Sequence, residues 1–162
     1  GFSVASVSDR FIKRSSKIIN KGYILDVNTY EKYYYKNQTP YTPSIPHLFG
    51  LKKVLELIEN EGLENRWSRH KEMAKVVRDW AISKGQSLYA EKGFESNTVT
   101  SIRNDMKWDI DKINEKLLMK GFRMDRGYGS LRGKVFRISH MGNIFLEDLS
   151  EYIENFEECL NV

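Results

Sequence analysis

One arginine stands in a segment whose pattern predicts a strand. Arg137 lies within Val135–Ile138, between two glycine-bearing segments. A guanidinium held on a strand has little freedom, and it can bind a carboxylate through two parallel hydrogen bonds. The alternative, which the residues favour equally, is a partly exposed arginine in an internal ion pair. The residues alone leave both interpretations open.

Two threonines and a serine lie among the only prolines of the chain, within Thr39–Pro46. Such a stretch resists regular structure and then starts a helix, because proline is tolerated in the first helical turn. Free N–H groups and the helix dipole favour a bound anion at that point, with Thr39 and Thr42 as its hydroxyl donors. The simpler alternative, which the residues favour, is that Thr42 or Ser44 only caps the helix.

The other residue types that carry chemistry form no recognisable site. The three histidines lack the spacing of a helical metal pair, so we expect structural or exposed roles for His47, His70 and His140 and no metal site. The glycine-rich stretch 127–135 is not a phosphate loop, because Val135 stands where a magnesium-binding serine or threonine is required and a strand follows it. It turns the chain or lets the backbone approach a ligand.

The first part of the chain is predicted to hold a short strand and helices. Alternating residues predict a strand over residues 2–7, and Ser8 is a suitable N-cap for a helix that runs to about Asn20. Its basic face is best explained as a solvated surface. A short extended piece is expected at Tyr23–Leu25, and the tyrosines of residues 30–35 could stack on a ligand, although packing is their commoner use.

The second part has the pattern of an α+β layer. Helices are expected around residues 51–58, over residues 67–81 with Trp67 and Trp80 on the buried stripe, around residues 110–117 and from about Phe145 onward. Four short strands are expected between the helices, at residues 87–90, 98–102, 121–124 and 135–138. We therefore predict a small, largely antiparallel sheet with helices on one face, and domains of residues 1–46 and 47–162.

Composition excludes several functional classes. The net charge of +4, with 22 acidic residues among 26 basic ones, is too mild to indicate a nucleic-acid partner. No apolar run approaches the about 20 residues that cross a bilayer, so no membrane partner is expected. The single cysteine, Cys159, excludes an internal disulfide and a zinc–cysteine cluster, and a reducing, cytoplasmic setting follows as the default expectation.

Three stretches together resemble a known enzyme family. They are residues 38–44 with the helix and Glu61–Asn65 that follow, the segment Asn97–Thr100, and Gly133–Gly142. Their order and spacing are similar to the class V, alanine–glyoxylate/serine–pyruvate aminotransferases, which depend on pyridoxal phosphate. The resemblance implies an α/β parent with the pyridoxal-phosphate transferase fold, of which this chain is mainly the C-terminal small domain after a remnant of the large domain.

The resemblance also implies roles for three residues. Arg137 matches the arginine that binds the substrate's α-carboxylate, Thr42 matches the hydroxyl that reaches the cofactor phosphate of the neighbouring subunit in a homodimer, and Thr39 is a weaker match to a second phosphate contact. The family's Schiff-base lysine lies just before a turn whose glycine matches Gly1, so this chain holds no catalytic residue and is expected to be inactive alone. The substrates would be a small amino acid and a 2-oxo acid.

Departures from the family pattern leave the substrates open. Serine stands at Ser139 and Arg126-Gly127 replaces the usual glycine pair, and both changes can alter the substrate pocket. A cysteine desulfurase of the same superfamily is disfavoured, because Cys159 falls in the terminal helix rather than in a loop. From another class, the chain could be an independent α+β module that binds a partner protein through its tyrosine cluster.

Overall fold

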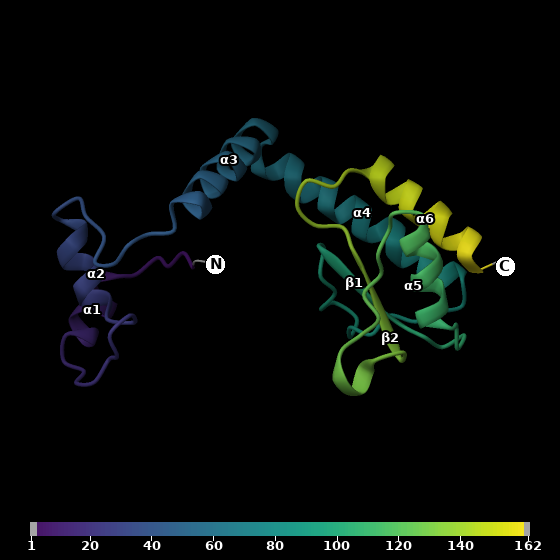
Figure 1. Cartoon of the computed structure of the whole chain (residues 1–162), viewed down its shortest axis with the longest axis horizontal. Helices are drawn as coiled ribbons and strands as arrows, with labels where there is room; N and C mark the ends of the chain where they lie inside the picture. The colour runs from purple at the N-terminus through teal and green to yellow at the C-terminus, as the bar shows by residue number, and fades with distance from the viewer. Residues whose placement is uncertain (1–2, 161–162) are drawn as a thin grey trace. The chain divides into compact units, whose positions relative to one another are not determined.

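The computed structural model describes residues 3–160, which divide into two compact units (Figure 1). The first unit ends at Asn60 and the second begins at Glu61. The family domains predicted to meet between residues 46 and 47 stay a prediction. The match of Gly1 to the family's turn glycine lies outside the described residues, as does Phe2 of the predicted first strand.

The described part of the first unit contains three helices. They are α1 (Asp9–Ser15), α2 (Val27–Tyr34) and α3 (Ile45–Glu61), the last of which ends at the first residue of the second unit. As predicted, Ser8 is the N-cap of α1, and its hydroxyl accepts a hydrogen bond from the backbone N–H of Phe11. The helix is shorter than expected: after Ser15 the N–H groups of Lys17 and Ile18 bond the carbonyls three residues back, and the Ser16 hydroxyl donates to the Lys13 carbonyl.

Both extended segments expected in this unit are absent from the described residues. Residues 3–7 form no strand and residues 23–25 form a turn, because neither segment has a partner strand to pair with. The tyrosines pack on one another instead. The Tyr41 ring contacts the rings of Tyr23 and Tyr30, with centroids 4.9 and 5.8 Å apart, and its hydroxyl donates to the Tyr23 carbonyl at 2.5 Å.

The second unit is an α+β layer, as the sequence predicts. Its strands β1 (Val99–Arg103) and β2 (Val135–Ser139) pair antiparallel, with Ser101 opposite Arg137. The helices are α4 (Leu63–Ser83), α5 (Ile110–Met119) and α6 (Leu146–Leu160), with a 3₁₀ turn, η1 (Gly129–Leu131). Alternate strand positions supply the buried side chains Thr100, Ile102, Phe136 and Ile138, and Val135 at the start of β2 is buried as well. The helices therefore cover one face of the sheet (Figure 1).

The core of this unit is aromatic. The Phe156 ring of α6 lies at the centre of the cluster, 5.1 Å from Trp80 on α4 and 5.8 Å from Phe136 on β2. Trp67 was wrongly assigned to the buried stripe of α4. It is 62% exposed and lies one turn before His70, the first buried residue of that helix.

Two of the four predicted strands are not strands. In residues 87–90 one bridge forms, between Leu88 and Ile102. Residues 121–124 form none, and the bridge on that side comes from the next residue, Asp125, which pairs with Arg137. One bridge cannot continue as a ladder, so these segments remain loops. The second of these bridges places a carboxylate directly beside the candidate arginine.

Candidate functional site

Arg137 occupies the middle of β2 and points away from the helices. Its strand neighbours Phe136 and Ile138 are buried in the core, and side chains alternate along a strand, so the guanidinium lies on the opposite face of the sheet. Its side chain keeps 38% of its surface exposed. The strand thus fixes the base of the side chain while its charged end stays accessible.

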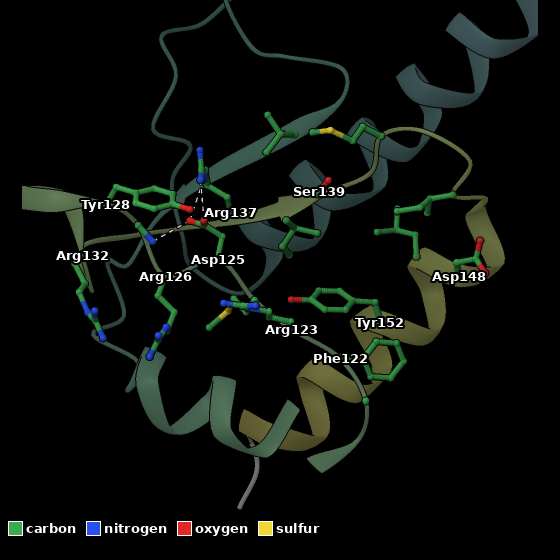
Figure 2. A pocket seen from close by; sticks show the side chains of 18 of the residues that line it. Phe122, Arg123, Asp125, Arg126, Tyr128, Arg132, Arg137, Ser139, Asp148 and Tyr152 are labelled. Atoms are coloured by element: carbon green, nitrogen blue, oxygen red, sulfur yellow. Dashed lines mark hydrogen bonds and ion pairs between the residues drawn. The ribbon is translucent and has the colours of Figure 1, made fainter. Parts of the chain in front are cut away.

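The guanidinium of Arg137 makes a bidentate ion pair with Asp125. Nε donates to Oδ1 at 2.9 Å and Nη2 donates to Oδ2 at 2.7 Å (Figure 2). The structure therefore shows the internal ion pair that was one of the two interpretations of this arginine. It also shows that the side chain adopts the fork geometry that recognises a planar carboxylate.

Asp125 is itself held by the backbone. Its carbonyl accepts the N–H of Arg137 at 3.1 Å, and its Oδ1 accepts the N–H of Gly127 at 2.9 Å. Gly127 has a φ of +79°, and a Cβ at this position would lie 2.6 Å from the carbonyl oxygens of both Leu131 and Val135. Only glycine fits there, and the two backbone hydrogen bonds hold Asp125 beside Arg137.

The ion pair shifts the titration of both partners. Hydrogen bonding to Arg137 lowers the pKa of the Asp125 carboxyl below its usual value, and the Gly127 N–H acts in the same direction against the effect of burial. The hydrogen bonds that Arg137 donates to Asp125 raise the pKa of Arg137. Both groups are therefore charged at neutral pH, and the pair persists across the physiological range.

A tyrosine covers one face of the guanidinium. Arg137 Cζ lies 5.1 Å from the centroid of the Tyr128 ring, within the range of a cation–π contact. Tyr128 itself is 72% exposed, and it comes from the same loop as Asp125 and Gly127. One edge and one face of the guanidinium are thus occupied by a single loop.

These groups line a cavity of about 980 Å³ within the second unit. Figure 2 shows Arg137, Asp125 and Tyr128 together at one end, while Tyr152 of α6 directs its hydroxyl inward from the other side. Burial raises the pKa of Tyr152, so its phenol is protonated at neutral pH. The positions that depart from the family pattern, Ser139 and Arg126-Gly127, also line the cavity.

The rim of the cavity near Met141 and Ile144 is tied to α4. Arg69 donates to the carbonyls of Ile144 and Gly142, and Glu61 accepts from Arg69 Nε at 2.6 Å and from Arg66 Nη1 at 2.8 Å. The two arginines lower the pKa of Glu61 to about 2. This charged clamp fixes the chain that enters α6, which carries Tyr152.

The two predicted phosphate ligands lie in the first unit. Thr39 and Thr42 are exposed, and neither hydroxyl has a hydrogen-bond partner within residues 3–160. The residue directly before α3 is Ser44, whose hydroxyl lies 2.6 Å from Nδ1 of His47. Thr39 and Thr42 therefore keep free donors just before a 17-residue helix. Because Arg137 belongs to the other unit, the structure describes each site only within its own unit.

The remaining candidates behave as structural residues. His140 is fully buried and its Nε2 lies 2.9 Å from the Thr100 hydroxyl, and His70 is 7% exposed. Within residues 3–160 no group of three or more metal-binding side chains is found, and none of the helices there is long and apolar enough to cross a membrane. The predicted cytoplasmic location stays a prediction.

The sequence did not reveal Asp125, Tyr128 or Tyr152 as site residues. The spacing Asp125-Arg126-Gly127 is the one available signal, because an aspartate two residues before a glycine often accepts that residue's N–H. The contact between Asp125 and Arg137 depends on a loop return of 12 residues, which residue spacing does not predict.

Comparisons with known proteins give a consistent result. No family model matches the chain. It is 37% identical over 145 residues to an uncharacterised aminotransferase of Methanocaldococcus jannaschii and 32% identical over 150 residues to a serine–glyoxylate aminotransferase of Arabidopsis thaliana. These alignments cover 88% and 89% of this chain but only 38% and 37% of the relatives.

A solved structure agrees with these relatives. The alanine–glyoxylate aminotransferase of Nostoc matches 96% of this chain with a TM-score of 0.83 and 28% identity, and the match covers 42% of that protein. The sequence relatives and the solved structure thus agree on one family, and this chain spans less than half of each of them. The chain belongs to the class V aminotransferases, the family of the alanine–glyoxylate and serine–glyoxylate enzymes, and corresponds to their C-terminal part.

Proposed function

We propose that this chain is the substrate-binding C-terminal part of an aminotransferase that moves an amino group between a small amino acid and a 2-oxo acid. The amino acid is of the alanine or serine type, and the 2-oxo acid is of the glyoxylate or pyruvate type. The observation that carries the proposal is Arg137, a guanidinium in carboxylate-binding geometry, fixed on a strand and open to a cavity of about 980 Å³.

Arg137 orients the substrate in this proposal. Its remaining N–H groups bind the α-carboxylate, and a strand-held side chain fixes the direction of the substrate's Cα–H bond. Tyr128 keeps water from one face of the guanidinium, which strengthens the charge interaction with the substrate. The cavity walls formed by Ser139 and Arg126 lie where they would limit the substrate's side chain.

The family uses pyridoxal phosphate, and residues of the first unit fit its phosphate. Thr42, with Thr39 as a second donor, presents a free hydroxyl ahead of α3, where unpaired backbone N–H groups favour an anion. When bound, the cofactor takes up the negative charge that develops at the substrate's Cα. Thr42 would serve the phosphate of a neighbouring subunit, so we propose a homodimer. The lysine that carries the cofactor lies outside this chain, and we expect the chain alone to be inactive.

The test is Arg137→Ala in the longer protein that carries this chain. Loss of the bidentate contact should lower kcat/KM for the amino acid about a hundredfold, which corresponds to about 2.7 kcal/mol, while the bound cofactor's visible absorbance is retained. The matched control is Arg132→Ala. Arg132 lines the same cavity, but it is 60% exposed and makes only a 3.4 Å contact with Asp111.

Two results would contradict the proposal. If Arg137→Ala releases the cofactor, the residue belongs to the cofactor site rather than to the substrate site. If Arg132→Ala lowers kcat/KM as strongly as Arg137→Ala, the cavity attracts substrates only through its general positive charge, and Arg137 has no specific role.

A further inference from the structure

The edge of Arg137 that lies next to its strand is already occupied. Nε and Nη2 both donate to Asp125, so two of the five N–H groups of the guanidinium are used. Asp125 uses only Nε and Nη2, and the Tyr128 side chain also interacts with the guanidinium and raises its pKa. Among the described residues the far edge, formed by Nη1 and the second hydrogen of Nη2, pairs with no carboxylate. Because Asp125 occupies the near edge, a second carboxylate in the guanidinium plane can make a bidentate contact only along that far edge.

We propose that Asp125 is a positioning residue that turns the far edge of Arg137 toward the substrate's carboxylate. Arg137 then bridges two carboxylates, one built into the loop and one brought by the substrate. The inference rests on the proposed function of Arg137 as the carboxylate-binding residue. It extends that function, because it assigns a role to a residue that acts through Arg137.

The surroundings of Asp125 fit this role better than a chance surface pair. A surface ion pair usually leaves both side chains mobile and contributes little. Asp125 is instead fixed by its carbonyl contact to Arg137 N–H and by the Gly127 N–H on Oδ1. At Gly127 the loop packs closely against the carbonyl oxygens of Leu131 and Val135, which leaves no room for a Cβ. A fixed acceptor can set the rotation of a guanidinium, which a mobile one cannot.

The substitution Arg137→Lys provides the sharpest test. A lysine ammonium is a single point charge without a second edge, so pairing with Asp125 would leave little of its charge available to bind the substrate's carboxylate. In the longer protein, Arg137→Lys should therefore raise KM for the amino acid at least fiftyfold. Adding Asp125→Asn to Arg137→Lys should release the ammonium and lower that KM by fivefold or more. A merely structural Asp125 predicts the opposite, because the second change would add its own damage.

Asp125→Asn alone should raise KM about tenfold and change kcat little, since its amide can accept only one of the two hydrogen bonds from Arg137. Asp125→Glu, which keeps the charge but not the geometry, should have an intermediate KM and serves if the asparagine variant does not fold. The control is Asp111→Asn, since Asp111 pairs with Arg126 and Arg132 but not with Arg137. Acetate is a carboxylate that does not react. Its affinity, measured by NMR titration, should fall in the same variants in which KM rises.

The outcomes separate the two proposals. If Arg137→Ala leaves KM and kcat unchanged, the proposed function fails and this inference falls with it. If Arg137→Ala impairs the enzyme while Asp125→Asn does not change KM or acetate binding, only the inference is overturned. It is also overturned if Arg137→Lys with Asp125→Asn is no better than Arg137→Lys alone.

Discussion

Gly127 offers a measurement of how strongly the loop holds Asp125. An alanine at this position would have to adopt a φ of +79°, which costs a residue with a Cβ about 1–2 kcal/mol. Its Cβ would also lie 2.6 Å from two carbonyl oxygens, those of Leu131 and Val135. Backbone atoms cannot move aside as a flexible side chain can, so this overpacking adds about 1–3 kcal/mol. We expect Gly127→Ala to destabilise the second unit by about 2–5 kcal/mol.

Gly133 supplies the matched control within the same loop. Its φ is +71°, but no atom lies within 4 Å of an added Cβ, so Gly133→Ala should cost only the backbone contribution of about 1–2 kcal/mol. The difference between the two variants then measures the collision alone.

Urea unfolding followed by tryptophan fluorescence is the suitable assay. The three tryptophans, Trp67, Trp80 and Trp108, all belong to the second unit, so the signal reports that unit. Equal free energies of unfolding for the two alanine variants would refute the idea that the packing at Gly127 fixes the loop. In the longer protein, Gly127→Ala should also raise KM for the amino acid and Gly133→Ala should not.

Two further predictions concern the core. Burial lowers the pKa of His140, so below pH 6.5 this side chain binds a proton in the unfolded chain but not in the folded one. The free energy of unfolding should therefore fall by up to about 1.4 kcal/mol per pH unit between pH 6.5 and the lowered pKa. This fall should be smaller in His140→Gln. Phe156→Ala should destabilise the second unit by about 3–5 kcal/mol in the same urea assay, because it empties the centre of the aromatic cluster. Phe156→Leu should destabilise it clearly less. A loss below about 1 kcal/mol for Phe156→Ala would contradict that packing.

Periodicity predicted the elements that pack against others in the same unit. Residues 110–117 and the terminal helix carry their apolar residues on one face, and the structure buries Ile113 and Phe156 as expected. The prediction was wrong for Trp67, since a stripe says which face is apolar but not how far along the helix a partner extends. It was also wrong for residues 3–7, where alternation predicts a strand but nothing in the described chain pairs with it.

The site was predictable in its arginine but not in its carboxylate. Arg137 was identified because a charged residue within an apolar strand pattern is conspicuous. Asp125 lies in a loop whose shape depends on Gly127. That shape brings Oδ1 of Asp125 to Nε of Arg137, which is 12 residues further along the chain. Residue types and spacing describe local conformation well, but they do not show which groups a loop brings back to a strand.

The loop that carries Asp125 has a second consequence, for self-association. In a two-stranded sheet each strand is an edge strand, and exposed edges invite pairing with other chains. The segment at Ser87 and Tyr89 shields β1 through two backbone hydrogen bonds, and the carbonyl of Asp125 shields β2 at Arg137. Remodelling this loop to change substrate preference would therefore also unmask an edge, and light scattering of such variants would detect the resulting oligomers.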